Sequence, residues 1–305
     1  MICHYNELHQ HPKIFRSLTG LTLGEFDDLF RDLEGYYIEA ESKRLYRANR
    51  QREIGGGRHC DLGVRDQVLL TIVWLRVYPT QAVLGYLFGV SATNVLRTTR
   101  KVLPVLEAQG RDTMRMPRPG KKRRRKLDDL LRDIPELAVV VDTFEQRVQR
   151  PQVREEADKL YSGKKKAHTL KSQVAVDEVS GQVVDVSQSV PGPTADIKLL
   201  EQSGLMRRLH PGTCCLGDLA YVGIDALGRG SAPRRKPRDR ERPPPDILYN
   251  TAFSRRRIVV EHTLSRFRRF QSLTQTDRHR RHAHTARVCA VAGLVNRQLA
   301  HRFPC

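Results

Sequence analysis

The sequence predicts an α/β protein in which an all-α module precedes a layered domain of strands and helices. Three observations carry this prediction. Residues 1–117 hold apolar side chains at helical spacing, residues 118–126 include seven basic side chains, and short apolar runs alternate with helical segments from residue 137 to residue 305. A run this basic does not pack into a core, so we expect a linker with a short helix over residues 118–136.

The charge of the chain indicates a polyanionic partner. Lys and Arg number 54 against 34 Asp and Glu, a formal net charge of +20, and nucleic acid is the commonest polyanion. Residues 1–60 are neutral, whereas residues 255–305 hold twelve arginines and supply half of the surplus. No apolar run approaches the ~18–20 residues that span a membrane, and the N-terminus lacks a signal-peptide layout. We expect a cytoplasmic protein that binds neither a membrane nor a small-molecule substrate.

The N-terminal module contains a helix-turn-helix pattern over residues 80–103. A helix over 80–88, a turn at 89–91 and a second helix over 92–103 are expected, with Gly89 ending the first and Ser91 capping the second. Earlier, Thr22 and Glu25 form a capping box, and residues 65–77 form another helix. Val95, Leu96 and Leu103 face inward. The outward positions carry short polar or cationic side chains suited to a major groove: Thr93, Asn94, Arg97, Thr98, Arg100 and Lys101. The alternative is an ordinary αα-hairpin.

Two short apolar runs in the second domain each lead into an aspartate. Residues 137–141 are apolar and run into Asp142, and residues 214–216 lead to Asp218 in the same way. Each reads as a buried strand that ends at its carboxylate. Residues 144–150, 169–177 and 182–187 are strand-like, and a helix follows over about 194–202. A strand-end aspartate that only starts a turn is the alternative at Asp142.

The C-terminal part is rich in arginine. A basic loop over about 228–248 precedes a long helix over 250–273 and a last helix over 283–301. Arg257, Glu261 and Arg268 fall within a narrow arc of the long helix, because four and eleven residues are close to whole turns. Three carboxylates that converge at a sheet edge are oxygen ligands for a hard divalent cation, and two ions about 3.5–4 Å apart support in-line phosphoryl transfer. Taken alone, this constellation is a weak signal.

The order of motifs resembles the DDE transposases of bacterial insertion sequences, in the group that shares its catalytic domain with Harbinger-type elements. The resembling segments, in chain order, are residues 140–142, 149–151, 161–166, 168–171, 191–196, 216–221 and 256–262. The helix-turn-helix pattern also resembles the one that precedes this catalytic domain in the family. The resemblance covers about residues 21–296.

The resemblance implies a ribonuclease-H-like catalytic domain over residues 137–305. It places Asp142, Asp218 and Glu261 as catalytic residues and metal ligands for Mg²⁺, with two ions expected and Mn²⁺ able to substitute. The expected contacts to DNA are cationic or polar side chains: Thr93, Asn94, Arg97, Arg100, Lys101, Lys164, Lys165, Lys166, Arg257 and Arg268. The chain departs from the family in having Arg268 in place of a Lys, Ser254 in place of a Tyr, and Thr143-Phe144 after the first Asp.

The implied function is that of a transposase. Such an enzyme binds the terminal inverted repeats of its element, cleaves DNA with a metal-activated water, and uses the freed 3′-hydroxyl to attack target DNA. A homo-oligomer on double-stranded DNA, associated with a bacterial nucleoid, is the expected setting. Two alternatives stay open: a domesticated, non-catalytic helix-turn-helix DNA-binding protein, and a metal-dependent endonuclease without strand transfer.

Two further groups of residues have simpler interpretations. Asp196 is expected to cap its helix rather than to bind metal. The histidines 279, 282 and 284 lie near Cys289, but the surrounding arginines favour a solvated basic face over a zinc site. The six cysteines show no CxxC spacing, so we expect them to be reduced.

Overall fold

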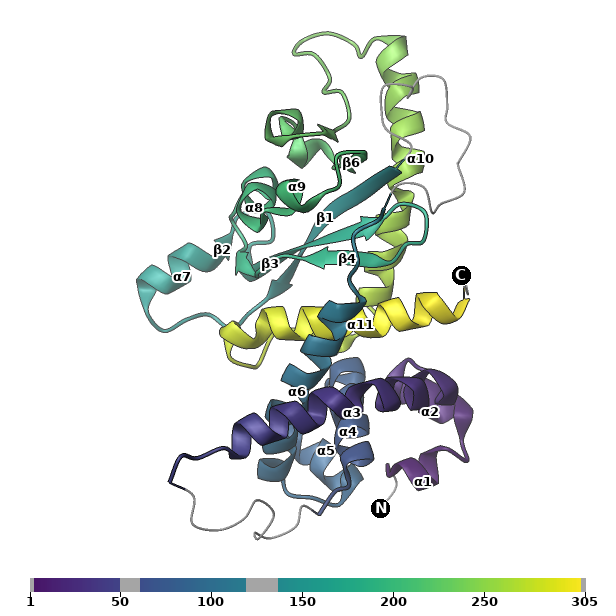
Figure 1. The fold of residues 1–305 in the computed structure, drawn as a ribbon. Helices are drawn as coiled ribbons and strands as arrows, with labels where there is room; N and C mark the ends of the chain where they lie inside the picture. The colour runs from purple at the N-terminus through teal and green to yellow at the C-terminus, as the bar shows by residue number, and fades with distance from the viewer. Residues whose placement is uncertain (1–2, 50–60, 119–136, 303–305) are drawn as a thin grey trace.

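The protein consists of a helical N-terminal part and a curled mixed sheet with helices on both faces (Figure 1). The computed structural model describes residues 3–49, 61–118 and 137–302. Within these ranges the predicted fold class is confirmed. The predicted linker and its short helix lie outside the described residues, apart from Arg118, and the domain limits placed there stay predictions.

Six helices make up the described N-terminal part. They are α1 (Tyr5–Leu8), α2 (Pro12–Thr19), α3 (Leu23–Leu45), α4 (Val64–Val77), α5 (Gln81–Phe88) and α6 (Ala92–Thr113). The predicted capping box opens α3, since Thr22 accepts from the Glu25 N–H and the Glu25 carboxylate accepts from the Thr22 N–H. Gly89 ends α5 with a φ of 68°, and the Ser91 hydroxyl accepts from the Asn94 N–H. The helix-turn-helix prediction is thus confirmed in its local geometry.

Helix α6 ends at Thr113 rather than near residue 103, although Pro104 lies inside it. An internal proline costs a backbone hydrogen bond, and packing against α11 (His284–Arg302) compensates for that cost. The two helices approach so closely at Gly110 that an added Cβ would lie 2.5 Å from the Cys289 carbonyl oxygen. One apolar core therefore continues from the N-terminal helices through α11 to the sheet.

The sheet is organised around β1 (Leu137–Arg147). Strand β3 (Ala167–Asp177) pairs with it antiparallel on one side, and β6 (Thr213–Leu216) pairs with it parallel on the other. Short strands extend both edges: β2 (Tyr161–Ser162), β4 (Val183–Val186) and β5 (Val190–Pro191) pair with β3, and β7 (Gly230–Ser231) pairs with β6.

The prediction that Asp142 ends its strand is wrong. Strand β1 continues to Arg147 and joins the two stretches that the sequence analysis treated as separate. The reason is long-range: β3 is equally long and supplies pairing partners without a break from Val139 to Arg147. The neighbouring strand β6 is the one that ends near Asp142, because its last residue, Leu216, pairs with Val140. Asp142 therefore lies just beyond the point at which the sheet loses a strand.

Alternate residues of β1 face opposite layers, as strand geometry requires. Ala138 and Val140 face the core shared with α10 (Pro244–Phe267) and α11, while Val139 and Val141 face the core shared with α8 (Asp196–Ser203) and α9 (Leu205–Arg208). Farther along the first face, the Phe144 and Phe267 ring centroids lie 6.2 Å apart. Asp142 alternates in step with Ala138, Val140 and Phe144, so its side chain lies on the same face of β1, toward α10.

The basic loop is shorter than predicted. Strand β7 occupies Gly230–Ser231, and α10 begins at Pro244, four residues before the predicted end of the loop. Prolines are tolerated in the first helical turn because their missing N–H groups would have no partner there. The helix ends at Phe267 rather than near residue 273, and the short helix η4 (Gln271–Leu273) follows it.

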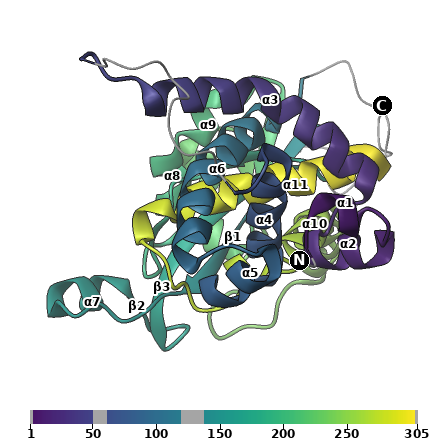
Figure 2. The ribbon, with the colours of Figure 1, turned by 90° about the horizontal axis from the view of Figure 1, so that it is seen from below.

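The remaining short elements lie at the edges of the sheet. They are α7 (Arg154–Leu160), η2 (Leu219–Tyr221), η3 (Ile224–Leu227) and η5 (Arg281–Ala283). Helix α7 and strand β2 project away from the body of the molecule (Figures 1 and 2). The described cysteines, at positions 3, 214, 215 and 289, are free and buried. Over the described ranges, no helix has the length and apolar character to cross a bilayer.

Candidate active site and nucleic-acid interface

Asp142 and Asp218 lie side by side at the end of β6. The parallel register pairs Val140 with Leu216, so two more steps along each chain bring residue 142 opposite residue 218. Asp142 accepts a hydrogen bond from the Thr143 N–H at 2.7 Å, and Asp218 caps η2 by accepting from the Ala220 N–H at 2.9 Å. Within the described ranges, neither carboxylate forms an ion pair.

The pKa of Asp142 is raised from 3.8 to about 6. Burial is the largest cause, because desolvation disfavours the ionised form. The Thr143 N–H lowers this pKa, the charge of Asp218 raises it, Arg257 lowers it and Asp196 raises it. A desolvated carboxylate beside a second carboxylate is a position where a bound cation would relieve both penalties.

Glu261, the third predicted ligand, lies on the solvent-exposed side of α10. One turn earlier on the same helix, Arg257 is close enough to Asp142 to lower its pKa. No three His, Cys, Asp or Glu side chains in the described parts of the chain are grouped closely enough to hold a metal ion. The structure thus brings Asp142 and Asp218 together and leaves Glu261 outside this pair.

The two predicted DNA-contacting arginines of α10 differ in burial. Arg257 is half-buried, and its Nε atom is buried without a hydrogen-bond partner among the described residues. Arg268 is exposed at the C-terminal end of the helix. The next residue before Arg257, Arg256, is instead committed to the core, where its guanidinium donates to Glu178 at 2.7 and 2.8 Å.

The prediction that Asp196 caps its helix is wrong. Ala195 occupies the N-cap position of α8, and no side-chain cap is present. The Asp196 carboxylate instead accepts from the Lys171 ammonium at 2.6 Å, and the same ammonium lies 3.8 Å from Glu145. Lys171 is buried on β3. Of the two carboxylates, Asp196 lies close enough to Asp142 to raise its pKa.

The predicted DNA-contacting lysines 164, 165 and 166 are exposed on the turn between β2 and β3. Lys166 has a φ of 47°, a left-handed conformation that is uncommon outside glycine. The turn connects β2 and β3 at the edge of the sheet where these two strands pair.

The predicted outward face of α6 is only partly exposed. Thr93, Arg97 and Arg100 are exposed, whereas Thr98 is buried, so its predicted outward orientation is wrong. Helical position explains this, because Thr98 follows buried Val95 by three residues.

Two further predicted contacts on α6 are partly engaged within the protein. Asn94 is half-buried and donates to Asp61 at 3.3 Å. Lys101 pairs with Glu41 at 3.2 Å and stacks over the Tyr37 ring. Of the predicted contacts on α6, Thr93, Arg97 and Arg100 remain exposed.

A groove of about 690 Å³ separates α6 from the loop that precedes α11. Trp74 and His279 lie on its inner side, with ring centroids 4.8 Å apart. Its basic members are Arg100 on α6 and, across the groove, Arg278, Arg280, His282 and Arg287. Burial and the neighbouring guanidiniums lower the pKa of His279. The sequence indicates a basic face around residues 278–282, but it does not show that this face lies opposite α6.

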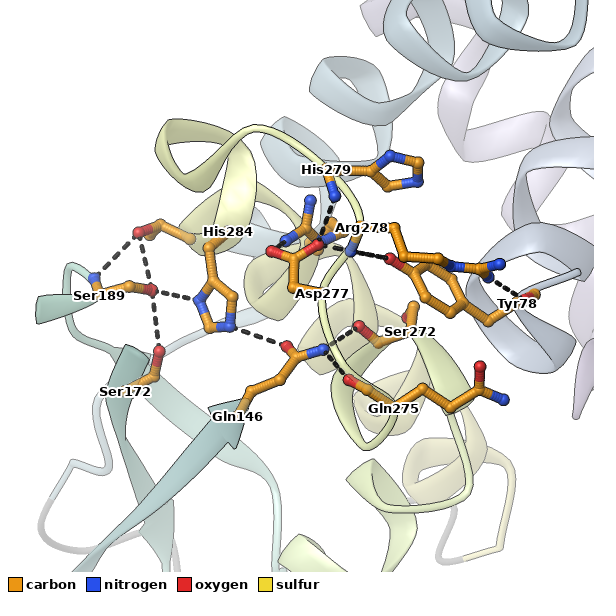
Figure 3. A network of polar contacts seen from close by, with 12 residues as sticks. Tyr78, Gln146, Ser172, Ser189, Ser272, Gln275, Asp277, Arg278, His279 and His284 are labelled. Carbon is orange, nitrogen blue, oxygen red and sulfur yellow. Dashed lines mark hydrogen bonds and ion pairs between the residues drawn. The ribbon is translucent and has the colours of Figure 1, made fainter. Parts of the chain in front are cut away.

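A buried polar network joins this loop to the end of β1 (Figure 3). The Gln146 amide donates to the Ser272 and Gln275 carbonyls, and its oxygen lies 2.9 Å from His284 Nε2. His284 Nδ1 lies 2.7 Å from the Ser189 hydroxyl. Burial, together with the nearby Arg287, lowers the pKa of His284 to about 3. Both ring nitrogens of His284 are thus used in hydrogen bonds, and the side chain is buried rather than on a solvated face.

The same network reaches the helix-turn-helix. Asp277 pairs with Arg287 and accepts from the Tyr78 hydroxyl at 3.3 Å and from the His279 N–H at 2.9 Å. Tyr78 ends α4 in the left-handed conformation, directly before α5. Buried hydrogen bonds therefore connect the C-terminal end of β1, through residues 275–277, to the end of α4, which precedes the helix pair that carries Arg97.

Comparison with known proteins gives a consistent result. Residues 141–296 match the profile of the DDE superfamily endonuclease family, and residues 60–112 match the helix-turn-helix of DDE superfamily endonucleases. The chain is also 29% identical over 286 residues to a probable transposase for insertion sequence element IS702 from Microchaete diplosiphon, covering 93% of this chain and 97% of the relative. No solved structure matches.

Proposed function

Because the chain belongs to the DDE superfamily endonuclease family, we propose that it is a transposase that binds the terminal inverted repeats of a mobile element and catalyses DNA cleavage and strand transfer. The family match and the similarity to a probable transposase support an endonuclease of the transposase type. The finer steps are our proposal. The observation that carries it is the desolvated Asp142–Asp218 pair at the end of β6.

The carboxylate pair fits a divalent cation. DDE superfamily endonucleases are metal-dependent, usually on Mg²⁺. Asp142 and Asp218 offer hard oxygen ligands on rigid backbone, and their pairing raises the energy of the metal-free ionised state. When bound, Mg²⁺ or Mn²⁺ would polarise a phosphate oxygen and lower the pKa of an attacking hydroxyl, and a second ion would stabilise the leaving oxygen.

The side chains around the pair would position the substrate. Glu261, at the exposed side of α10, would complete the ligand set from the face that the DNA approaches. Arg257 has a buried Nε donor without a protein partner among the described residues, so a phosphate oxygen could accept from it. Lys171 would hold Asp196 and Glu145 out of the ligand set, because its ammonium already pairs with both.

End recognition would rest on the helix-turn-helix. Thr93, Asn94 and Arg97 occupy the first turns of α6, the part of a recognition helix that contacts base edges. Arg100, Arg268 and the lysines of the β2–β3 turn would contact phosphates, and Lys101 would do so only by exchanging its pair with Glu41. We further propose that the active complex holds more than one copy of the chain on paired DNA ends.

The test is the Asp142→Asn variant, measured on DNA that carries the ends of the element. Mg²⁺-dependent strand cleavage should disappear while the dissociation constant for end DNA stays within about threefold. The thermal shift that Mg²⁺ gives the wild-type chain should also disappear, which tests the ligand role without relying on turnover. An equal loss of end binding would overturn the assignment. Asp225→Asn, an exposed aspartate on η3, is the matched control.

Strand transfer needs a separate measurement. Joined products formed from pre-cleaved ends and target DNA would support a transposase, whereas nicking without joining would indicate an endonuclease. Mg²⁺-independent end binding without cleavage would indicate a DNA-binding protein whose catalytic domain is only structural.

A further inference from the structure

Four arginines from distant parts of the chain line one small cavity on the side of the molecule where α2, α4 and α10 meet. The cavity has a volume of about 70 Å³. Its lining consists of the arginines and three neighbouring groups: Arg16, Arg76, Arg266, Arg269, Gly20, Glu25 and Gln298. We call it the arginine cavity. None of its residues belongs to the carboxylate pair or to the helix pair α5–α6, whereas Arg76 lies on α4, inside the matched range 60–112.

The negative C-terminal ends of helices offset only part of the positive charge in the cavity. Arg16, Arg76 and Arg266 lie in the last turns of α2, α4 and α10, where a helix carries roughly half a negative charge. Arg266 is left out of this balance, because it has a further interaction within the protein. The ends of α2 and α4 and the Glu25 carboxylate would offset roughly two of the three positive charges of Arg16, Arg76 and Arg269. The Glu25 carboxylate also accepts the Thr22 N–H of the capping box. About one positive charge of these three arginines is left without compensation.

The Arg76 guanidinium is held in a fixed place. It lies 5.3 Å from the centroid of the Phe270 ring. On its other side is Gly20, whose φ is +80° and where an added Cβ would approach the guanidinium to 3.4 Å. Gln298 donates to the Gly20 carbonyl at 2.7 Å and fixes this turn. The donors of Arg76 are therefore preorganised.

The arginines of the cavity repel one another. The pKa of Arg76 is lowered by burial and by the charge of Arg269. Over the described part of the chain, neither of these residues nor Arg16 forms an ion pair with a carboxylate. Like charges gathered around a fixed guanidinium raise the free energy of the empty cavity, and a bound anion would lower it.

We propose that the arginine cavity binds the oxyanion of one phosphate group. Each water-sized group needs about 10–15 Å³ of such volume, so 70 Å³ holds roughly five to seven of them, and a phosphate has five heavy atoms. Guanidinium groups match a phosphate oxygen pair through two parallel hydrogen bonds. The phosphate can come from a DNA backbone or from free inorganic phosphate, and the experiment separates these sources.

The first measurement is the thermal unfolding of the full chain in inorganic phosphate against chloride at constant ionic strength. The cavity variant is Arg16→Gln/Arg269→Gln, since both residues are exposed at the rim. The control variant, Lys13→Gln/Arg154→Gln, removes the same charge from two exposed sites outside the cavity. Phosphate should stabilise the wild type and the control, and the cavity variant should bind phosphate at least about tenfold more weakly. No phosphate-specific stabilisation of the wild type, or equal affinity in both variants, overturns the proposal.

The second measurement is the salt dependence of binding to duplex DNA. If a backbone phosphate occupies the cavity, inorganic phosphate competes with DNA, and the slope of log K against log salt falls by roughly one to two in the cavity variant only. If phosphate binding is lost while the DNA slope is unchanged, the occupant is free phosphate. Both results support phosphate binding in the arginine cavity. Neither depends on cleavage at Asp142, so a failure here is separable from a failure of the proposed function.

Discussion

Two aspartates of the β1 region have opposite environments: Asp142 lies in the middle of the strand, and Asp277 lies beside its C-terminal end. Asp277 is 2% exposed and is fully engaged, with Arg287, the Tyr78 hydroxyl and the His279 N–H as partners. Asp142 is half-buried and accepts one side-chain hydrogen bond among the described residues, from the backbone N–H of its own neighbour Thr143. The first carboxylate links the end of α4 to α11 and to the loop before it. The second carries a desolvation penalty that the Thr143 N–H and the charge of Arg257 offset only in part.

The difference separates a carboxylate that stabilises the fold from one that is available for a ligand. A buried charge with several partners is expensive to disturb, because removing one partner leaves the other uncompensated. A desolvated charge with few partners costs stability, and groups with such shifted pKa values cluster at functional sites. Each prediction below changes one side of this comparison.

The largest effect is expected at Asp277. Asp277→Asn leaves Arg287 buried without its counter-charge and should lower the free energy of unfolding by about 3–5 kcal/mol. Urea denaturation at pH 7 measures this. The double variant Asp277→Asn/Arg287→Met should recover part of the loss, since the orphaned charge is then gone. If Asp277→Asn lowers the free energy of unfolding by less than about 1 kcal/mol, Asp277 is not the stabilising carboxylate that the comparison with Asp142 requires.

Acid should weaken the same region through His284. Its folded-state pKa of about 3 lies below the ordinary value near 6.5, so the unfolded chain binds the proton more readily between these values. The neutral-histidine contribution is fully present above pH 6.5 and is lost as pH falls toward 3, at about 1.4 kcal/mol per pH unit. From pH 6.5 to 4.5 the loss should reach about 2–3 kcal/mol.

The check for this acid effect is the His284→Gln variant. Its free energy of unfolding should be lower at pH 7 but less dependent on pH between 6.5 and 4.5. Parallel pH profiles for the variant and the wild type would show that other groups carry the acid sensitivity.

Asp142→Asn should change stability in the opposite direction from Asp277→Asn. Without divalent cations at pH 7, removing the desolvated charge should raise the free energy of unfolding by about 1–2 kcal/mol, since the shift from 3.8 to about 6 sets an upper limit near 3 kcal/mol. Thermal or urea unfolding in EDTA measures this gain. Asp225→Asn should remain within about 0.5 kcal/mol of the wild type. A destabilised Asp142→Asn variant would mean that this carboxylate is structural.

The smallest effect concerns the groove beside α6. Arg280→Gln removes one exposed cation opposite the recognition helix and should reduce the slope of log K against log salt by about one, with stability unchanged. Arg154→Gln, whose side chain is 94% exposed on α7, is the control. An unchanged slope for Arg280→Gln would place the DNA away from the 278–282 loop.

Local sequence signals predicted much of the fold. The capping box at Thr22, the cap at Ser91 and the positive φ at Gly89 depend on neighbours within four residues, so they could be read directly. Apolar alternation likewise indicated the buried strands. The same reasoning went wrong where a distant element decided the outcome, at the length of β1, at the extension of α6 past Pro104 and at the partner of Asp196.

The sequence by itself determined the two-part plan, the helix-turn-helix and the aspartates that follow the buried apolar runs, because each depends on periodicity or on short-range hydrogen bonds. Only the tertiary structure decided that Asp142 lies beside Asp218, that Lys171 holds Asp196, that the 278–282 loop faces α6, and that four arginines share one cavity. Each of these is a contact between residues far apart in the chain. Its geometry is fixed by strand register and helix packing, which no local pattern specifies.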